Sequence, residues 1–231
     1  MKKSFTLAYC MMIILAAAVQ AQELSFQHLA ANVEQRLNSI FDLHAVIDLE
    51  IVQQGQVVIT TFDLQSGKEQ KLTRLEVLAP ELAAGQIYLF DLENNQMSIY
   101  IPMAEQIILQ PLAGAAGTFG LSLDFANMDQ FLSLEDIKGE IEEVLTTEQG
   151  VTYKVKVTDL DQQALFLSSA STNPDLAVQY VWVDANFIPY RMEYYEGDVC
   201  LGKMLIREYE LNAGITAEQL RTLPDVPVLQ F

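Results

Sequence analysis

The chain has few of the residues on which most catalytic and metal-binding sites depend. Its 231 residues include only two cysteines, two histidines and one tryptophan. His28 and His44 lie in separate segments with no cysteine placed to complete a metal set, so we expect no metal and no other cofactor. The sequence also contains no zinc-protease, serine-hydrolase, phosphate-loop or dinucleotide-binding motif. These absences predict a protein that is not an enzyme.

Positive charge is also scarce, since 13 lysines and arginines stand against 31 aspartates and glutamates. Such an excess of negative charge repels phosphate backbones and anionic headgroups, which excludes nucleic acid as a partner. The simplest role of this charge is solubility. Half of the residues are apolar, so a folded core rather than disorder is expected.

The N-terminus carries the pattern of a secretory signal peptide. Lys2 and Lys3 precede an apolar run from Leu7 to Val19, and Ala21 ends the segment with a small side chain. The run is too short to span a bilayer, which takes about 20 residues. We therefore predict cleavage after Ala21, a periplasmic location, and a single domain over residues 22–231.

Removing residues 1–21 would leave 11 basic and 31 acidic residues, a net charge of about −20. Only Cys200 would remain of the cysteines, so no internal disulfide is possible. The fold must then depend on its hydrophobic core, in which Cys200 is expected to act as a small apolar residue. We expect a monomer.

The periodicity of apolar residues predicts a mainly β protein with two helices. The first helix is expected over residues 24–41, where apolar residues recur at helical spacing, and the second over 121–134. About six strands are expected between the helices and about five after them, most joined by short turns. Short turns favour an antiparallel sheet, and a long antiparallel sheet with two helices must curl to hide its apolar face.

Some expected strands have apolar residues on both faces, as in Ile87–Phe90, Ile107–Leu109 and Tyr180–Val183. Such strands need cover on both sides. A second layer of sheet would provide it in a sandwich, and an apolar ligand would provide it in a hollow fold. The sequence pattern leaves both interpretations open.

The order of segments resembles the LolA-like lipoprotein carrier family. The resemblance rests on Lys71–Pro80, Gly85–Asp91, Met97–Pro102 with the following Glu105-Gln106, and on the ending Gly214-Ile215-Thr216 with Leu223–Val226. It implies an incomplete antiparallel β-barrel closed by the N-terminal helix and a lid helix. It also implies a cavity for lipoprotein acyl chains or other lipids, an inner-membrane transporter that loads the carrier, and an outer-membrane receptor that unloads it.

The resemblance also indicates where a ligand would lie. Residues 112–120 would form the hinge of the lid, and Arg74 is the candidate for a lid latch, although no arginine occupies the place usual in the family, shortly before this strand. The residues expected to line the cavity, from the lid and from the sheet, are Ile99, Ile101, Met103, Phe119, Leu121, Phe125, Phe131, Tyr180 and Trp182.

The sequence therefore favours two functions. The first is an extracytoplasmic carrier of lipoprotein acyl chains or other lipids across the periplasm. The second is a non-enzymatic envelope sensor or structural interaction module of the same fold, which would have a filled core and bind a protein partner. An envelope hydrolase is the least favoured, because with 31 carboxylates some pair of them is inevitable.

Overall fold

A computed structural model describes residues 24–53, 55–112, 132–134, 137–147, 150–157 and 177–230. The predicted signal peptide, the hinge after Leu112 and most of the predicted lid helix lie outside these residues.

The described strands form a single sheet that is almost entirely antiparallel. Its strand order is β12-β6-β5-β4-β3-β2-β1-β11-β10-β9-β8-β7. Only β12 runs parallel to its neighbour, β6. The bounds are β1 Asp42–Gln53, β2 Gln56–Gly67, β3 Leu72–Ala79, β4 Ile87–Asp91, β5 Gln96–Ile101, β6 Gln106–Pro111, β7 Gly139–Thr147, β8 Gly150–Val157, β9 Ala177–Val183, β10 Pro189–Glu196, β11 Val199–Leu211 and β12 Val228–Gln230.

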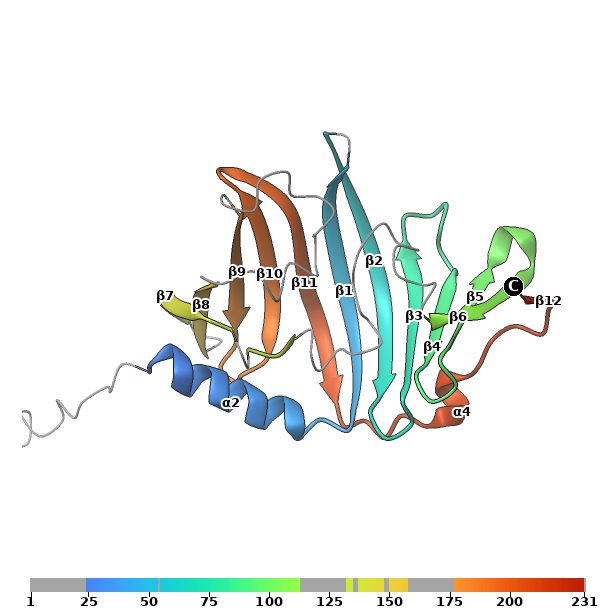
Figure 1. Cartoon of the computed structure of the whole chain (residues 1–231), viewed down its shortest axis with the longest axis horizontal. Helices are drawn as coiled ribbons and strands as arrows, with labels where there is room; N and C mark the ends of the chain where they lie inside the picture. The colour runs from blue at the N-terminus through green and yellow to red at the C-terminus, as the bar shows by residue number, and fades with distance from the viewer. Residues whose placement is uncertain are drawn as a thin grey trace, which may run out of the picture.

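The sheet is open, because β12 and β7 form its two ends and do not pair with each other (Figure 1). Helix α2, Phe26–Asn38, lies across the lower ends of β9 to β11 in this view, and the short helix α4, Ala217–Leu220, lies near β3. This arrangement confirms the expected incomplete antiparallel β-barrel and the N-terminal helix beside it.

Helix α2 forms where the sequence provides both a start signal and an apolar stripe. Ser25 caps the N-terminus, since its side-chain oxygen accepts a hydrogen bond from the His28 amide at 3.3 Å. Leu29, Val33 and Leu37 recur every four residues and are buried. The helix ends at Asn38, three residues before the predicted end, because the chain turns there into β1.

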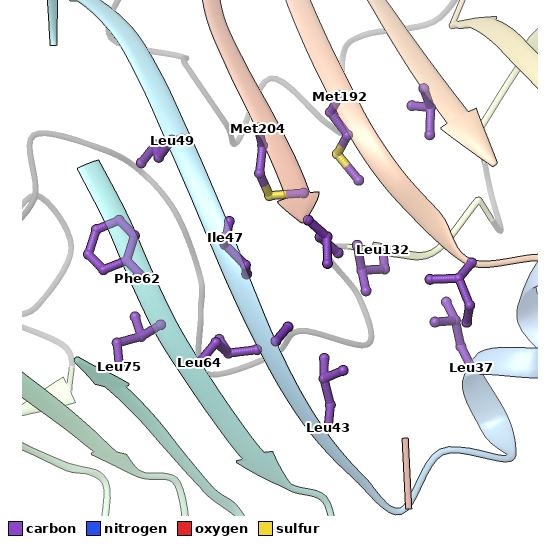
Figure 2. Packing of buried hydrophobic residues seen from close by; sticks show 14 of the residues in the cluster. Leu37, Leu43, Ile47, Leu49, Phe62, Leu64, Leu75, Leu132, Met192 and Met204 are labelled. Atoms are coloured by element: carbon purple, nitrogen blue, oxygen red, sulfur yellow. The ribbon is translucent and has the colours of Figure 1, made fainter. Parts of the chain in front are cut away.

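The strand alternation divides the sheet into two faces. We call the face that carries the main hydrophobic cluster the inner face, and the opposite one the outer face. Figure 2 shows that side chains from β1, β2, β3, β10 and β11 gather on the inner face with Leu37 of α2 and Leu132. The labelled members are Leu37, Leu43, Ile47, Leu49, Phe62, Leu64, Leu75, Leu132, Met192 and Met204.

The C-terminal segment contains two elements that periodicity did not predict. Helix α4 is a single turn held by a capping box between Thr216 and Gln219. Its Leu220 is fully buried with Leu72 and Leu89 in a second, smaller cluster on the outer face. Strand β12 has three residues and depends on its pairing with β6, which is a tertiary contact. Neither element is long enough to show a hydrophobic period.

Candidate functional site

The inner face is the candidate ligand surface, because it is apolar along nearly the whole sheet. Every strand from β1 to β5 and from β8 to β11 contributes at least one buried apolar residue to its cluster. Three methionines, Met97, Met192 and Met204, are at most 3% exposed there. Thioether side chains are flexible and adapt to ligands of different shape. This surface can bury hydrocarbon, and it offers few polar groups to a charged ligand.

Tyr88 is one of the tyrosines that bring a hydroxyl group into this mainly apolar cluster. The hydroxyl oxygen accepts a hydrogen bond from Gln86 Nε2 at 2.7 Å. Burial raises the pKa of Tyr88, and the hydrogen bond from Gln86 opposes this shift. The group is therefore neutral at physiological pH and adds no charge to the inner face.

Helix α2 is joined to the inner face by a clamp at Glu34. One carboxylate oxygen, Oε1, accepts hydrogen bonds from the Ser133 hydroxyl at 2.5 Å and from the Leu134 amide at 3.0 Å. The clamp holds Leu132 and Leu134 in the hydrophobic cluster, where they are 3% and 2% exposed. These two leucines occupy apolar surface that a ligand would otherwise contact.

A small cavity of about 30 Å³ lies next to this clamp, between the end of α2 and the start of β1. Leu37, Leu43 and Leu132 are among its lining residues. Its volume is that of a single water molecule. An acyl chain therefore cannot enter there unless neighbouring side chains move.

A second, more open depression of about 500 Å³ lies beside α4. Its walls include the exposed Phe41 and the buried carboxylate of Asp42, which accepts hydrogen bonds from the amides of Ala213 and Gly214 at 2.7 and 3.1 Å. Asp42 thereby ties the segment after β11 to the start of β1. Because its oxygens are already engaged by the backbone, we assign Asp42 a structural role.

Two of the predicted cavity residues lie on the inner face. Ile99 of β5 is 6% exposed and belongs to the main cluster, and Ile101 is half-buried against it. Met103 lies instead in the short 3-10 helix Pro102–Ala104 between β5 and β6, where it is 82% exposed. Phe119, Leu121, Phe125 and Phe131 lie outside the described residues and stay predictions.

Tyr180 and Trp182 of β9 lie on the outer face, because their neighbours Val181 and Val183 belong to the inner cluster. Lys154 Nζ lies 4.2 Å from the Tyr180 ring centroid, and Arg191 Cζ lies 4.3 Å from that of Trp182. These cation–π contacts explain why Trp182 is buried away from the hydrophobic cluster. Alternation showed that the two residues share a face, but it could not show which face.

Arg74 also lies on the outer face. Its Nη2 forms an ion pair with Glu76 Oε2 at 2.8 Å, two residues along β3, while Leu75 between them lies in the inner cluster. The structure thus places Arg74 away from the surface that a lid would cover. The residue that does fix a segment against α2 is Glu34, and its spacing of about 100 residues from Ser133 and Leu134 left no signal in the sequence.

The outer face contains a charged network around Glu193, which is 5% exposed. Glu193 accepts hydrogen bonds from Arg191 and from the Tyr195 hydroxyl, the latter at 2.8 Å, and Lys203 lies 3.9 Å away. The hydrogen bond to Glu193, with burial, raises the pKa of Tyr195 to about 12. Burial also raises the pKa of the neighbouring Cys200 thiol, so it is protonated at neutral pH.

Two further observations concern the described part of the chain. None of its helices has the length and apolar character needed to cross a membrane. Within the same residues, His, Cys, Asp and Glu side chains form no group of three or more that could hold a metal ion.

Comparison with known proteins shows the fold. No protein-family model matches the chain, and no curated protein matches it in sequence. An uncharacterized conserved protein from Thermus thermophilus is similar in structure, with a TM-score of 0.56 and 14% identity over 89% of this chain and 98% of that one. The lipoprotein LppX of Mycobacterium tuberculosis gives a TM-score of 0.52 and 10% identity over 83% and 99%.

A LolA superfamily protein from Nitrosomonas europaea is also among the similar structures. Its TM-score is 0.39, with 13% identity over 87% of this chain and 96% of that one. The chain shares its fold, at low sequence identity, with the Thermus thermophilus protein and with LppX.

Proposed function

We propose that this protein is a non-enzymatic carrier that works outside the cytoplasm and binds acyl chains against the inner face of its sheet. The cargo would be a lipoprotein or another lipid, carried across the periplasm after residues 1–21 are removed. The observation that carries the proposal is the continuous apolar inner face of a sheet whose ends are not joined. An open sheet can adjust its width around a ligand, which a closed barrel cannot do without breaking hydrogen bonds.

The energy of binding would come from burying hydrocarbon. Each methylene removed from water contributes about 0.8 kcal/mol, so a chain of about 16 carbons contributes roughly 10 kcal/mol before ordering costs. Leu132 and Leu134 now cover part of the inner face and would have to move as the ligand enters. Their return would favour release, which a carrier needs as much as binding.

In this proposal Ile99 and Ile101 contact the ligand on the β5 side of the sheet. Tyr180 and Trp182 would act only from the opposite face, by stabilising β9. We further propose that the carrier is a monomer that is loaded by an inner-membrane transporter and unloaded by an outer-membrane receptor. A lid formed by Phe119, Leu121, Phe125 and Phe131 remains part of the proposal.

The proposal is tested by searching for bound lipid. The protein is purified from the periplasm and examined by native mass spectrometry and lipid extraction, and the delipidated protein is titrated with a fluorescent long-chain fatty acid. We expect retained acyl chains and saturable binding of the probe. A protein that retains no lipid and fails to bind the probe would not be a carrier.

One strand provides a matched pair of variants. Ile108 of β6 is half-buried against the inner cluster, and Leu109 is half-buried on the outer face. Ile108→Gln places an amide beside the ligand and should weaken binding of the fatty acid by about tenfold, the effect of roughly 1.4 kcal/mol. Leu109→Gln should leave it unchanged. Equal losses in both variants would show that the ligand does not lie on the inner face.

A further inference from the structure

One end of the sheet exposes most of the large apolar side chains that are exposed in the described residues. It is formed by the turns β1–β2, β3–β4, β5–β6 and β10–β11, which lie in the upper half of Figure 1. We call it the upper end. Seven of twelve such exposed side chains lie there, namely those of Val57–Ile59, Leu78, Leu82, Met103 and Val199. Four separate turns thus each present an apolar group at the same end.

The β1–β2 hairpin is the most unusual of these turns. No residue from Ile51 to Phe62 is charged, in a chain with 44 charged residues among 231. Val57, Val58 and Ile59 are 58%, 40% and 51% exposed. Because neighbouring residues in a strand point to opposite faces, the hairpin is apolar on both of its sides. A flat protein surface could cover one side, whereas lipid surrounds a protruding hairpin completely.

The backbone of the hairpin is suited to shallow insertion. β1 and β2 pair without interruption up to Gln53 and Gln56, so the hairpin satisfies its inner backbone groups itself. The pairing of β2 with β3 begins only at Thr61, so the outer edge of Val57–Thr60 still needs water or headgroups as partners. These features fit the interfacial region of a bilayer and not its hydrocarbon centre.

The charges at the upper end determine which lipid headgroups it can approach. The described turns carry Glu81, Glu105, Glu196 and Asp198, and they contain no lysine or arginine. Anionic lipids would repel this end, while zwitterionic headgroups would not.

We infer that the upper end inserts into the interface of a bilayer with electrically neutral headgroups, with the β1–β2 hairpin as the main contact. The inference rests on the proposed carrier function for its purpose, since lipid must be taken from or delivered to a membrane. Membrane contact depends on the exposed residues of the upper end, whereas lipid binding depends on the buried residues of the inner face. An experiment can therefore refute one proposal without refuting the other.

The test is binding of the periplasm-purified protein to vesicles, measured by flotation. We expect binding to phosphatidylcholine vesicles and weaker binding when phosphatidylglycerol is added. The double variant Val57→Gln/Ile59→Gln should lower the partition coefficient by about tenfold, because two half-exposed side chains no longer gain from burial. The control is Val144→Gln, since Val144 of β7 is 54% exposed but lies away from the upper end.

Several results would overturn the inference. They are an absence of binding to either vesicle, stronger binding to the anionic vesicles, or equal effects of the Val57/Ile59 and Val144 variants. Circular dichroism checks that each variant is folded. Fatty-acid binding in solution should be unchanged in the Val57→Gln/Ile59→Gln variant. Failure of fatty-acid binding in the unaltered protein, with vesicle binding intact, would refute the carrier proposal and leave the membrane contact standing.

Discussion

Replacing Glu34 should release residues 132–134 from the sheet without unfolding it. The Glu34 carboxylate accepts two hydrogen bonds, from the Ser133 hydroxyl and from the Leu134 amide. A hydrogen bond to a charged group contributes about 1.5–3 kcal/mol when buried. Because Glu34 is only half-buried, we take roughly 1 kcal/mol for each bond, and about 2 kcal/mol for Glu34→Ala.

The Leu134 amide reports this change directly, because it is one of the two donors. A loss of about 2 kcal/mol corresponds to a roughly 30-fold increase in the population of the open state. Amide hydrogen exchange of Leu134, followed by NMR, should therefore become faster by about 30-fold in Glu34→Ala. Glu34→Gln keeps an oxygen acceptor without the charge, so its effect should be smaller.

The neighbouring residue provides the control. Gln35 is exposed on the other side of α2, and Gln35→Ala should leave exchange at Leu134 unchanged. Exchange within β1, for example at Ile47, distinguishes local opening from global unfolding, because it should stay slow in every variant. If Leu134 exchanges at the same rate in Glu34→Ala as in the unaltered protein, the clamp does not hold this segment and our reasoning is wrong.

Two further predictions concern stability and pH. Asp42→Ala removes the acceptor of two backbone amides that follow β11. The free energy of unfolding, measured by urea denaturation, should fall by about 3 kcal/mol. A loss below about 1 kcal/mol would contradict the structural role of Asp42. For Tyr195 the folded pKa of about 12 lies above the ordinary 10.0, so the stabilisation is complete below pH 10 and disappears as the pH rises toward 12. The difference in tyrosinate absorbance between the unaltered protein and Tyr195→Phe should show that late titration, and Glu193→Gln should shift it toward 10.

Much of the fold could be predicted from the sequence, because its signals are local. The expected strand segments Ile87–Phe90, Ile107–Leu109 and Tyr180–Val183 each lie within an observed strand, namely β4, β6 and β9. Turn residues such as Asn94 and Gly197 mark where the chain reverses. The mainly antiparallel order followed from these short connections. Helix α4 and β12 were not predicted, because a single turn and a three-residue strand are too short to show a period.

Only part of the candidate site could be predicted from the sequence. A period of two shows that Ile99 and Ile101 share one face, and likewise Tyr180 and Trp182, but it does not show which face is inner. The structure decides this, since Val181 packs into the cluster and Trp182 packs under Arg191 on the other side.

The apolar and polar periods, the turns, the excess of acidic residues and the lack of catalytic motifs could all be read from the amino-acid order. These are properties of neighbouring residues, and they require no knowledge of distant contacts. Only folding brings Glu34 to Leu134, about 100 residues away, and places the exposed apolar groups of four hairpin turns at one end of the sheet. Both depend on the order of strands in the sheet, which brings together residues that are far apart in the chain.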